Sequence, residues 1–224
     1  GLDAAYQRTD GINACRGSTA PFAGCFADEP DRDGYRNRSL NLRGGITLSD
    51  TLKLEGSALR AGSDNEFDGG SFGGNEAENV QQVVGGKLVF TPSPRFKLTT
   101  QAGRAYDKSD NFLADVRDGS RTYVSTFDTR RDTASIQGDI SFNANHLLSV
   151  GGDWQQDSIE SNTAFAVDER DNTAGFVEYQ ARFGAQRWQL SVRNDDKRQF
   201  GSHATGSVGW GVNLGRGWRT IPAR

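Results

Sequence analysis

Apolar and polar residues alternate with a period of two along most of the chain, which is typical of a β-strand whose two faces meet different surroundings. In residues 40–48, the even positions hold leucine, isoleucine or glycine, and the odd positions hold asparagine, arginine, glycine or threonine. No segment with a convincing helical period interrupts this pattern, so the sequence predicts an all-β fold. The same alternation recurs over residues 52–58, 134–142, 177–183, 188–193 and 208–214.

The connections between these segments alternate between short turns and long polar stretches. This order predicts an antiparallel, up-and-down meander of about ten strands with all its tight turns at one end, whereas a soluble sandwich more often mixes its connections in Greek keys. The short turns fall near residues 49–50, 92–94, 143–145, 184–185 and 215–217, and the long stretches cover roughly 10–34, 62–78, 107–121, 157–171 and 195–204.

The length of the segments decides which face is buried. The expected strands of about 10–14 residues exceed the ~5–6 of a typical soluble strand. Nine alternating residues, tilted by ~40°, span about 23 Å, close to the ~25 Å apolar band of an outer-membrane barrel. We therefore predict a transmembrane β-barrel segment with its apolar face toward lipid; the alternative is a lipocalin-like soluble barrel. Aromatic residues beside the short turns favour the membrane, as an interfacial girdle would require: Phe90, Phe96, Phe142, Phe183, Trp188 and Trp218.

The composition agrees with such a wall. Of 224 residues, 34% are hydrophobic and 28 are glycine, which suits strands that need apolar side chains on one face only. No apolar run approaches the ~20 residues of a membrane-spanning helix. A net charge of −3 gives no nucleic-acid footprint, so no nucleic-acid partner is expected. Because the sequence contains no methionine, we expect it to be the middle of something larger.

Two acidic stretches lie at the end of the predicted meander where the long connections emerge. Glu29, Asp31 and Asp33 place carboxylates at every second position before a glycine, and residues 64–70 form a second acidic stretch that Asn75 and Glu76 follow. Ca²⁺ takes six to eight oxygen ligands, and neighbouring loops can share an ion that neither holds alone. The alternative is a pair of solvated acidic turns.

The first long stretch also contains the only two cysteines, Cys15 and Cys25. An even number of cysteines in an exported chain suggests a disulfide that closes the loop, and the alternative is two unpaired thiols. Their spacing excludes a CxxC metal site.

The hypothesis that the protein is a hydrolase depends on one histidine. His203 follows Asp195 and Asp196 near the mouth of the predicted barrel, which permits an omptin-like protease with an Asp/His site on its rim. The other histidine, His146, falls at the opposite end beside a short turn. A polar rim residue explains His203 more simply, so no catalytic residue is expected.

With the loops placed, the sequence resembles the vitamin B12 (cobalamin) receptors of the Gram-negative outer membrane, a branch of the TonB-dependent transporters. The similarity covers nearly the whole chain, and the two acidic loops are its most diagnostic parts. The stretches that carry it are residues 9–13, 28–35, 65–69, 151–155, 193–196 and 199–203.

The resemblance implies calcium ions that order two extracellular loops for cobalamin capture. Asp31, Asp33 and Asp68 match acidic ligands, Glu29 matches a position that contributes a backbone oxygen, and Asn13 stands where the family can have aspartate. The last ligand falls on Asn75 or, in the assignment we adopt, Glu76. Two further positions match residues that contact cobalamin, namely Gly69 and Thr126.

The resemblance also implies a complete barrel of about 22 strands with an N-terminal plug that contacts TonB. The chain would supply part of that barrel, without the plug, in contact with outer-membrane lipid. The expected function is cobalamin capture and TonB-driven uptake, without enzymatic activity. A passive porin is the remaining alternative, and the preferred corrinoid is left open.

Overall fold

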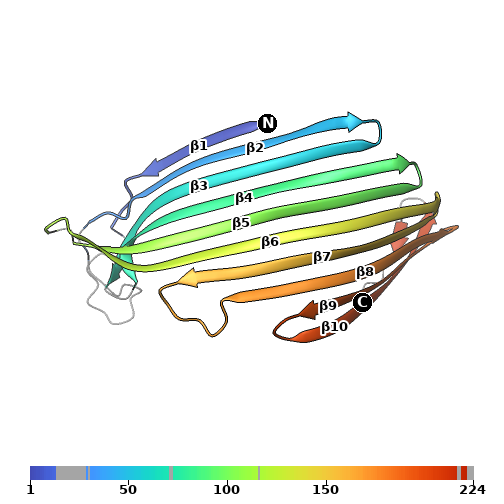
Figure 1. Ribbon diagram of the computed structural model, residues 1–224. Coiled ribbons are helices and arrows are strands. Elements are labelled where there is room, and N and C mark those ends of the chain that lie inside the picture. The colour runs from blue at the N-terminus through green and yellow to red at the C-terminus, as the bar shows by residue number, and fades with distance from the viewer. Residues whose placement is uncertain (14–28, 30, 71–72, 116, 216–217, 221–224) are drawn as a thin grey trace.

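The computed structural model describes residues 1–13, 29, 31–70, 73–115, 117–215 and 218–220. These residues form eleven β-strands, and every strand pairs antiparallel with the next one along the chain. The predicted up-and-down meander is therefore confirmed (Figure 1). The strands are β1 (Leu2–Thr9), β2 (Tyr35–Ser49), β3 (Leu52–Gly70), β4 (Gly74–Ser93), β5 (Phe96–Ala114), β6 (Arg121–Asn143), β7 (His146–Ser161), β8 (Glu169–Phe183), β9 (Gln186–Lys197), β10 (Gly201–Gly215) and β11 (Trp218–Thr220).

The short turns lie where the alternation predicts them. The strand pairs β2–β3, β4–β5, β6–β7 and β8–β9 are joined by two residues each, and these turns gather at one end of the sheet in Figure 1. At one of them Gly184 has a φ of 59°, a left-handed conformation that glycine adopts without strain.

Four of the predicted long loops are wrong in extent. Residues 62–78 and 107–121 are mostly strand, because β3 continues to Gly70 and β5 to Ala114, and β6 is 23 residues long. Between residues 157 and 171 only 162–168 separate β7 from β8, and between residues 195 and 204 only 198–200 separate β9 from β10. These segments are polar because the strands extend beyond the membrane, where both faces of the sheet meet water. Their polarity does not reflect a loss of strand pairing.

The register sorts side chains onto two contrasting faces. Leu42, Ala58 and Val84 are cross-strand partners in successive ladders, so they lie on one face, which we call the apolar face. The next row toward the short turns on that face holds only glycine on β2, β3 and β4, and the row after it includes Leu54 and Leu88. Large apolar side chains here remain exposed, as Val84 does at 55%.

The opposite face carries paired charges. Lys87 binds Glu55 across β3 and β4 at 3.1 Å, and Arg193 forms ion pairs with Asp153 and Asp195 at 2.7 and 2.9 Å. Hollows of about 840 and 670 Å³ are lined mostly by side chains of this polar face, which is therefore the concave side.

Almost nothing is buried between the two faces. Among the described residues, the buried hydrophobic side chains are only Ala77, Ala174 and Ala181. A soluble barrel would bury its apolar face inside, whereas this sheet presents it outward and turns its charged face to the hollow. That arrangement is the one a membrane barrel requires, with lipid outside and a wet lumen inside. The described residues contain no helix with the length and hydropathy needed to cross a bilayer.

Candidate functional site: an acidic group on two neighbouring hairpins

The first long connection is shaped by a glycine that no other residue could replace without strain. Gly11 has a φ of 63°, and a Cβ atom at this position would overlap the backbone carbonyl of Asp33. The Asp33 amide in turn donates to the Ile12 carbonyl at 3.1 Å. These contacts hold the two ends of the connection against each other just before β2 begins.

The hairpin of β3 and β4 leaves its regular ladder near its tip. The register shifts between Glu66 and Gly70, so Asp68 lies in an irregular part of β3. Below the irregularity, the Gly34 amide donates to the Glu66 carboxylate at 3.0 Å, and the Glu66 amide donates to the Gly34 carbonyl at 2.9 Å. These two bonds bring the hairpin tip beside the end of the first connection.

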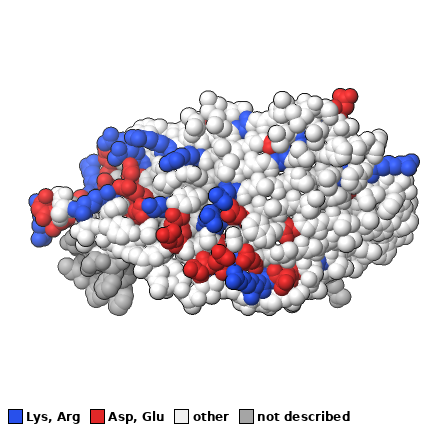
Figure 2. Space-filling model, in the orientation of Figure 1, with Lys and Arg blue, Asp and Glu red and all other residues white. Residues whose placement is uncertain are grey.

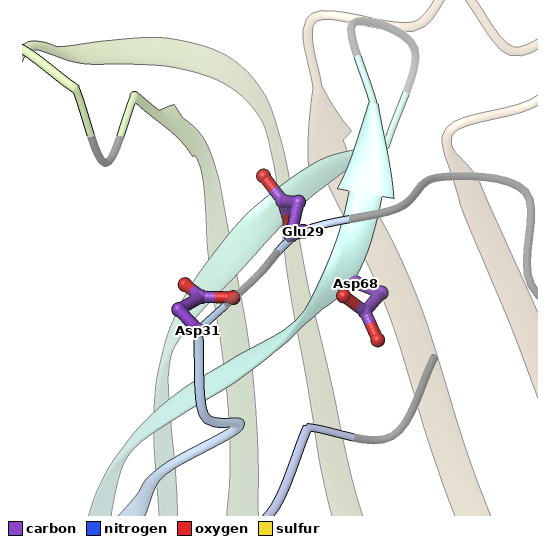
Figure 3. A group of neighbouring side chains, drawn as sticks. All are labelled: Glu29, Asp31 and Asp68. Carbon is purple, nitrogen blue, oxygen red and sulfur yellow. The ribbon is translucent and has the colours of Figure 1, made fainter. Parts of the chain in front are cut away.

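Three carboxylates meet where the two segments touch. Glu29 and Asp31 come from the first connection and Asp68 from β3, as Figure 3 shows. One oxygen from each lies within 4.8 Å of the others. Oxygens that bind one Ca²⁺ at about 2.4 Å can lie up to ~4.8 Å apart, so the three fit a shared ion.

Asn13 adds a fourth oxygen to this neighbourhood. Its Nδ2 donates to the Glu29 carbonyl at 2.6 Å, while its Oδ1 is buried and accepts no hydrogen bond from any described residue. A buried oxygen without a donor is costly in a folded protein unless a cation or water approaches it. The donor set of carboxylate and amide oxygens is the chemistry that a hard divalent cation prefers.

The two candidates for the last ligand have other partners. The Oδ1 of Asn75 accepts the Ala114 amide at 2.7 Å, and its Nδ2 donates to Glu29 Oε1 at 2.6 Å and to the Ala114 carbonyl at 2.8 Å. Asn75 is only 4% exposed. It therefore orients the Glu29 carboxylate and joins it to the end of β5, a role that the sequence did not suggest.

Glu76 turns toward an arginine. Arg121 Nε donates to Glu76 at 2.6 Å and Arg121 Nη1 to Glu78 at 2.7 Å, and the guanidinium lies 3.6 Å from the centre of the Phe112 ring. Partial burial lowers the pKa of Arg121, but the hydrogen bonds to Glu78 and Glu76 outweigh it and hold that pKa above its usual value. The structure thus places the Glu76 carboxylate against Arg121 and outside the three-carboxylate group.

The remaining expected site residues lie nearby but apart from the group. Asp33 also stands outside the three carboxylates. Gly69 packs so closely on the Gly74 carbonyl that a Cβ atom would overlap it. The packing of the hairpin therefore requires glycine at this position whether or not it contacts a ligand. Thr126, on β6, donates its hydroxyl to Asp110 at 2.7 Å and its amide to Asn162 at 3.2 Å. Cys15 and Cys25, and with them the expected disulfide, lie outside the described residues.

The two histidines do not form a site together. His203 is opposite Asp195 in the ladder of β9 and β10, but Arg193 already binds that carboxylate. His146 lies at the short-turn end, where its Nδ1 is 2.6 Å from the Tyr179 hydroxyl. The described residues therefore contain no Asp/His pair arranged for hydrolysis around His203.

A wall of long antiparallel strands with an apolar outer face and a charged inner face defines the class of outer-membrane β-barrels. Solved structures agree with this. The ferric enterobactin receptor PfeA of Pseudomonas aeruginosa superimposes with a TM-score of 0.69 at 14% identity, covering 96% of this chain and 37% of that one. The siderophore receptor PirA of Acinetobacter baumannii superimposes with a TM-score of 0.69 at 17% identity, covering 96% and 36%.

Among the outer-membrane barrels, the chain matches a segment of the TonB-dependent receptor barrels of Gram-negative bacteria. Its curated relatives include the vitamin B12 transporter BtuB of Photobacterium profundum, 26% identical over 215 residues, 92% of this chain and 32% of that protein. The chain thus spans about a third of the length of the relatives it matches. No protein-family model matches it. The relatives named here are receptors and transporters, in agreement with the expectation that the chain is not an enzyme.

Proposed function

We propose that the receptor containing this chain captures cobalamin at its extracellular mouth, with calcium ordering the first connection and the β3–β4 hairpin, and that uptake is driven through TonB. The observation that carries the proposal is the meeting of Glu29, Asp31 and Asp68 within 4.8 Å across two separate segments. The similarity to a vitamin B12 transporter supports cobalamin as the ligand.

The geometry supports different roles for the residues of the site, some binding the ion and one orienting a ligand. Glu29, Asp31 and Asp68 would hold the ion, with the buried Oδ1 of Asn13 as a further ligand. Asn75 keeps the Glu29 carboxylate in place through a hydrogen bond of 2.6 Å. When bound, calcium would offset the mutual repulsion of the carboxylates and hold the two segments together. No bond in the ligand needs to be made or broken.

Capture would then depend on loops that are ordered before the ligand arrives. Ordering a flexible segment at the moment of binding weakens affinity, so a cation that orders it beforehand strengthens capture. Gly69 and Thr126 are proposed to contact cobalamin, the first from the hairpin tip and the second from β6. TonB would act through a plug domain, and outer-membrane lipid would surround the apolar face.

The test is cyanocobalamin binding by the intact receptor, with calcium or with a chelator. We expect calcium to raise the affinity of the unaltered receptor and to have little effect on an Asp31→Asn/Asp68→Asn variant. Asp10→Asn is the matched control, because Asp10 is exposed and pairs only with Arg8 among the described residues. Equal affinities in calcium and chelator for the unaltered receptor would contradict the proposal. Competition by ferric enterobactin would contradict the choice of ligand.

A further inference from the structure

The apolar face of the wall ends in a row of hydrogen-bond donors. Next to the row of Leu42, Ala58 and Val84, the following row away from the short turns contains Arg60 and Gln82. It continues across β5 and β6 through Tyr106 and Arg130. Figure 2 shows the same change, since charged side chains are sparse toward the short-turn end and gather toward the long connections.

The height of Arg60 and Arg104 places them at the edge of the lipid, whereas Arg38 and Arg130, 12 and 14 residues from the turn residues Asp50 and Ala144, lie further out along their strands. Arg60 is nine residues beyond the turn residue Thr51, and Arg104 is nine beyond Arg95. At ~3.3 Å per residue and a tilt of ~40°, nine residues correspond to about 23 Å above the short turns. That is close to the full ~25 Å height of the apolar band, so both guanidiniums lie where the outer-leaflet headgroups begin.

Positive charge exceeds negative charge in this region. Arg104 and Arg130 share a single carboxylate, that of Asp132, at 2.5 and 3.3 Å. The Asp132 side chain is 15% exposed, whereas the two arginine side chains are 54% and 45% exposed. One carboxylate thus faces two guanidiniums that remain open to the surroundings.

Two further arginines have no carboxylate partner among the described residues. Arg38 is opposite Gly62, and Arg60 is opposite Leu40, so the two arginines are diagonal neighbours on β2 and β3. The Arg38 guanidinium lies 6.0 Å from the Tyr6 ring centre, and neither arginine forms an ion pair with a described residue. Two like charges at adjacent positions favour an anion between them, and guanidinium groups bind phosphate oxygens in pairs.

We propose that Arg38, Arg60, Arg104 and Arg130 form a binding site for the phosphate groups of an outer-leaflet lipid, on the outside of the barrel. Neighbouring strands are ~4.8 Å apart, so β2 to β6 offers guanidiniums over about 19 Å, wide enough for more than one phosphate of the same headgroup. The acyl chains of that lipid would lie along the apolar face below, against Leu42 and Val84. This site is separate from the acidic group and does not depend on the ligand of the receptor.

The experiment titrates the purified intact receptor, in a neutral detergent, with diphosphoryl lipid A. An arginine near an anionic headgroup contributes roughly a five-fold change in affinity, so Arg38→Gln/Arg60→Gln is expected to weaken binding by about 25-fold. Arg38→Lys/Arg60→Lys keeps the charge and should retain most of the affinity, which separates the site from a general folding defect.

A second control lies on the other face. Arg43 and Lys87 belong to the polar face by their register with Ser57 and Glu55, so Arg43→Gln/Lys87→Gln removes the same charge without touching the proposed site. This variant should bind like the unaltered receptor. Dephosphorylated lipid A should bind weakly to every variant. Equal binding of lipid A to the Arg38→Gln/Arg60→Gln variant and the unaltered receptor would overturn the proposal. Full displacement of lipid A by millimolar inorganic phosphate would overturn its assignment to a lipid.

Discussion

Substitution of Asn75 distinguishes a shared calcium site from a set of independent acidic turns. Its side chain is 4% exposed and makes three hydrogen bonds, two with the Ala114 backbone and one with Glu29 Oε1. Asn75→Ala removes all three and leaves the Ala114 amide and carbonyl without these partners. Each neutral bond is worth about 1 kcal/mol and the bond to the carboxylate about 1.5–3 kcal/mol, so the hairpin tip should lose roughly 4 kcal/mol of local stability.

Only part of that loss should appear in calcium binding. The bond to Glu29 is the part that orients a ligand, and 1.5–3 kcal/mol corresponds to an increase of about 10-fold to 150-fold in the dissociation constant for calcium. The assay is a calcium titration of the intact receptor, with hydrogen exchange of the β3–β4 hairpin as a second readout. Exchange near the tip should become faster in the variant.

The matched control is Asn79→Ala on the same strand. Asn79 donates a single long hydrogen bond of 3.5 Å to Ser63, so its loss should change the calcium affinity by less than about two-fold. If Asn75→Ala bound calcium as tightly as Asn79→Ala, Asn75 would not orient Glu29 toward an ion, and the reasoning would be refuted.

Three more substitutions test other parts of the structure. Gly11→Ala should weaken cyanocobalamin binding, because Gly11 has a φ of 63° and a Cβ atom there would overlap the Asp33 carbonyl. Gly119→Ala is the control, since Gly119 has a φ of 71° but open space around it, so this variant carries only backbone strain. Equal losses of affinity in the two variants would show that the overlap at Gly11 has no effect. Arg193→Met should lower the midpoint of thermal unfolding by an amount equivalent to about 2 kcal/mol, because it removes the cation shared by the Asp153 and Asp195 carboxylates and leaves Asp195 with the hydrogen bond from Asn172. Arg8→Met, which breaks an exposed pair, should leave the midpoint unchanged, and equal midpoints for the two variants would refute the stabilising role of Arg193. His203→Ala should leave cyanocobalamin affinity unchanged, and loss of a peptidase activity in this variant would instead support an omptin-like enzyme.

The membrane-facing part of the fold follows directly from the sequence. Alternation over residues 40–48 predicts both the strand and its apolar face, because lipid on one side and water on the other leave a period of two in the residue types. The ends of the strands could not be predicted in the same way. At Glu66, paired with Glu76, both residues are charged although the ladder still continues. Above the bilayer both faces are wet, so polarity no longer distinguishes strand from loop.

The acidic group was only partly predictable, for reasons of distance along the chain. The carboxylates of Asp31 and Asp68 were expected from the resemblance, and the structure brings them together. Glu29 was expected to offer its backbone oxygen, but that oxygen accepts a hydrogen bond from Asn13, and the Glu29 carboxylate joins the group instead. The partners that orient the site were not expected. Asn75 is hydrogen-bonded to the Ala114 backbone, 39 residues away, and Glu76 accepts a hydrogen bond from Arg121, 45 residues away. Such contacts arise from strand register, which the local sequence does not reveal.

The most direct test of the central claim is an anomalous difference map from crystals of the intact receptor grown with calcium. We expect a peak between the first connection and the β3–β4 hairpin, with oxygens of Glu29, Asp31 and Asp68 at about 2.3–2.6 Å from its centre. A map with no peak there, at a calcium concentration that supports full cyanocobalamin binding, would contradict the account.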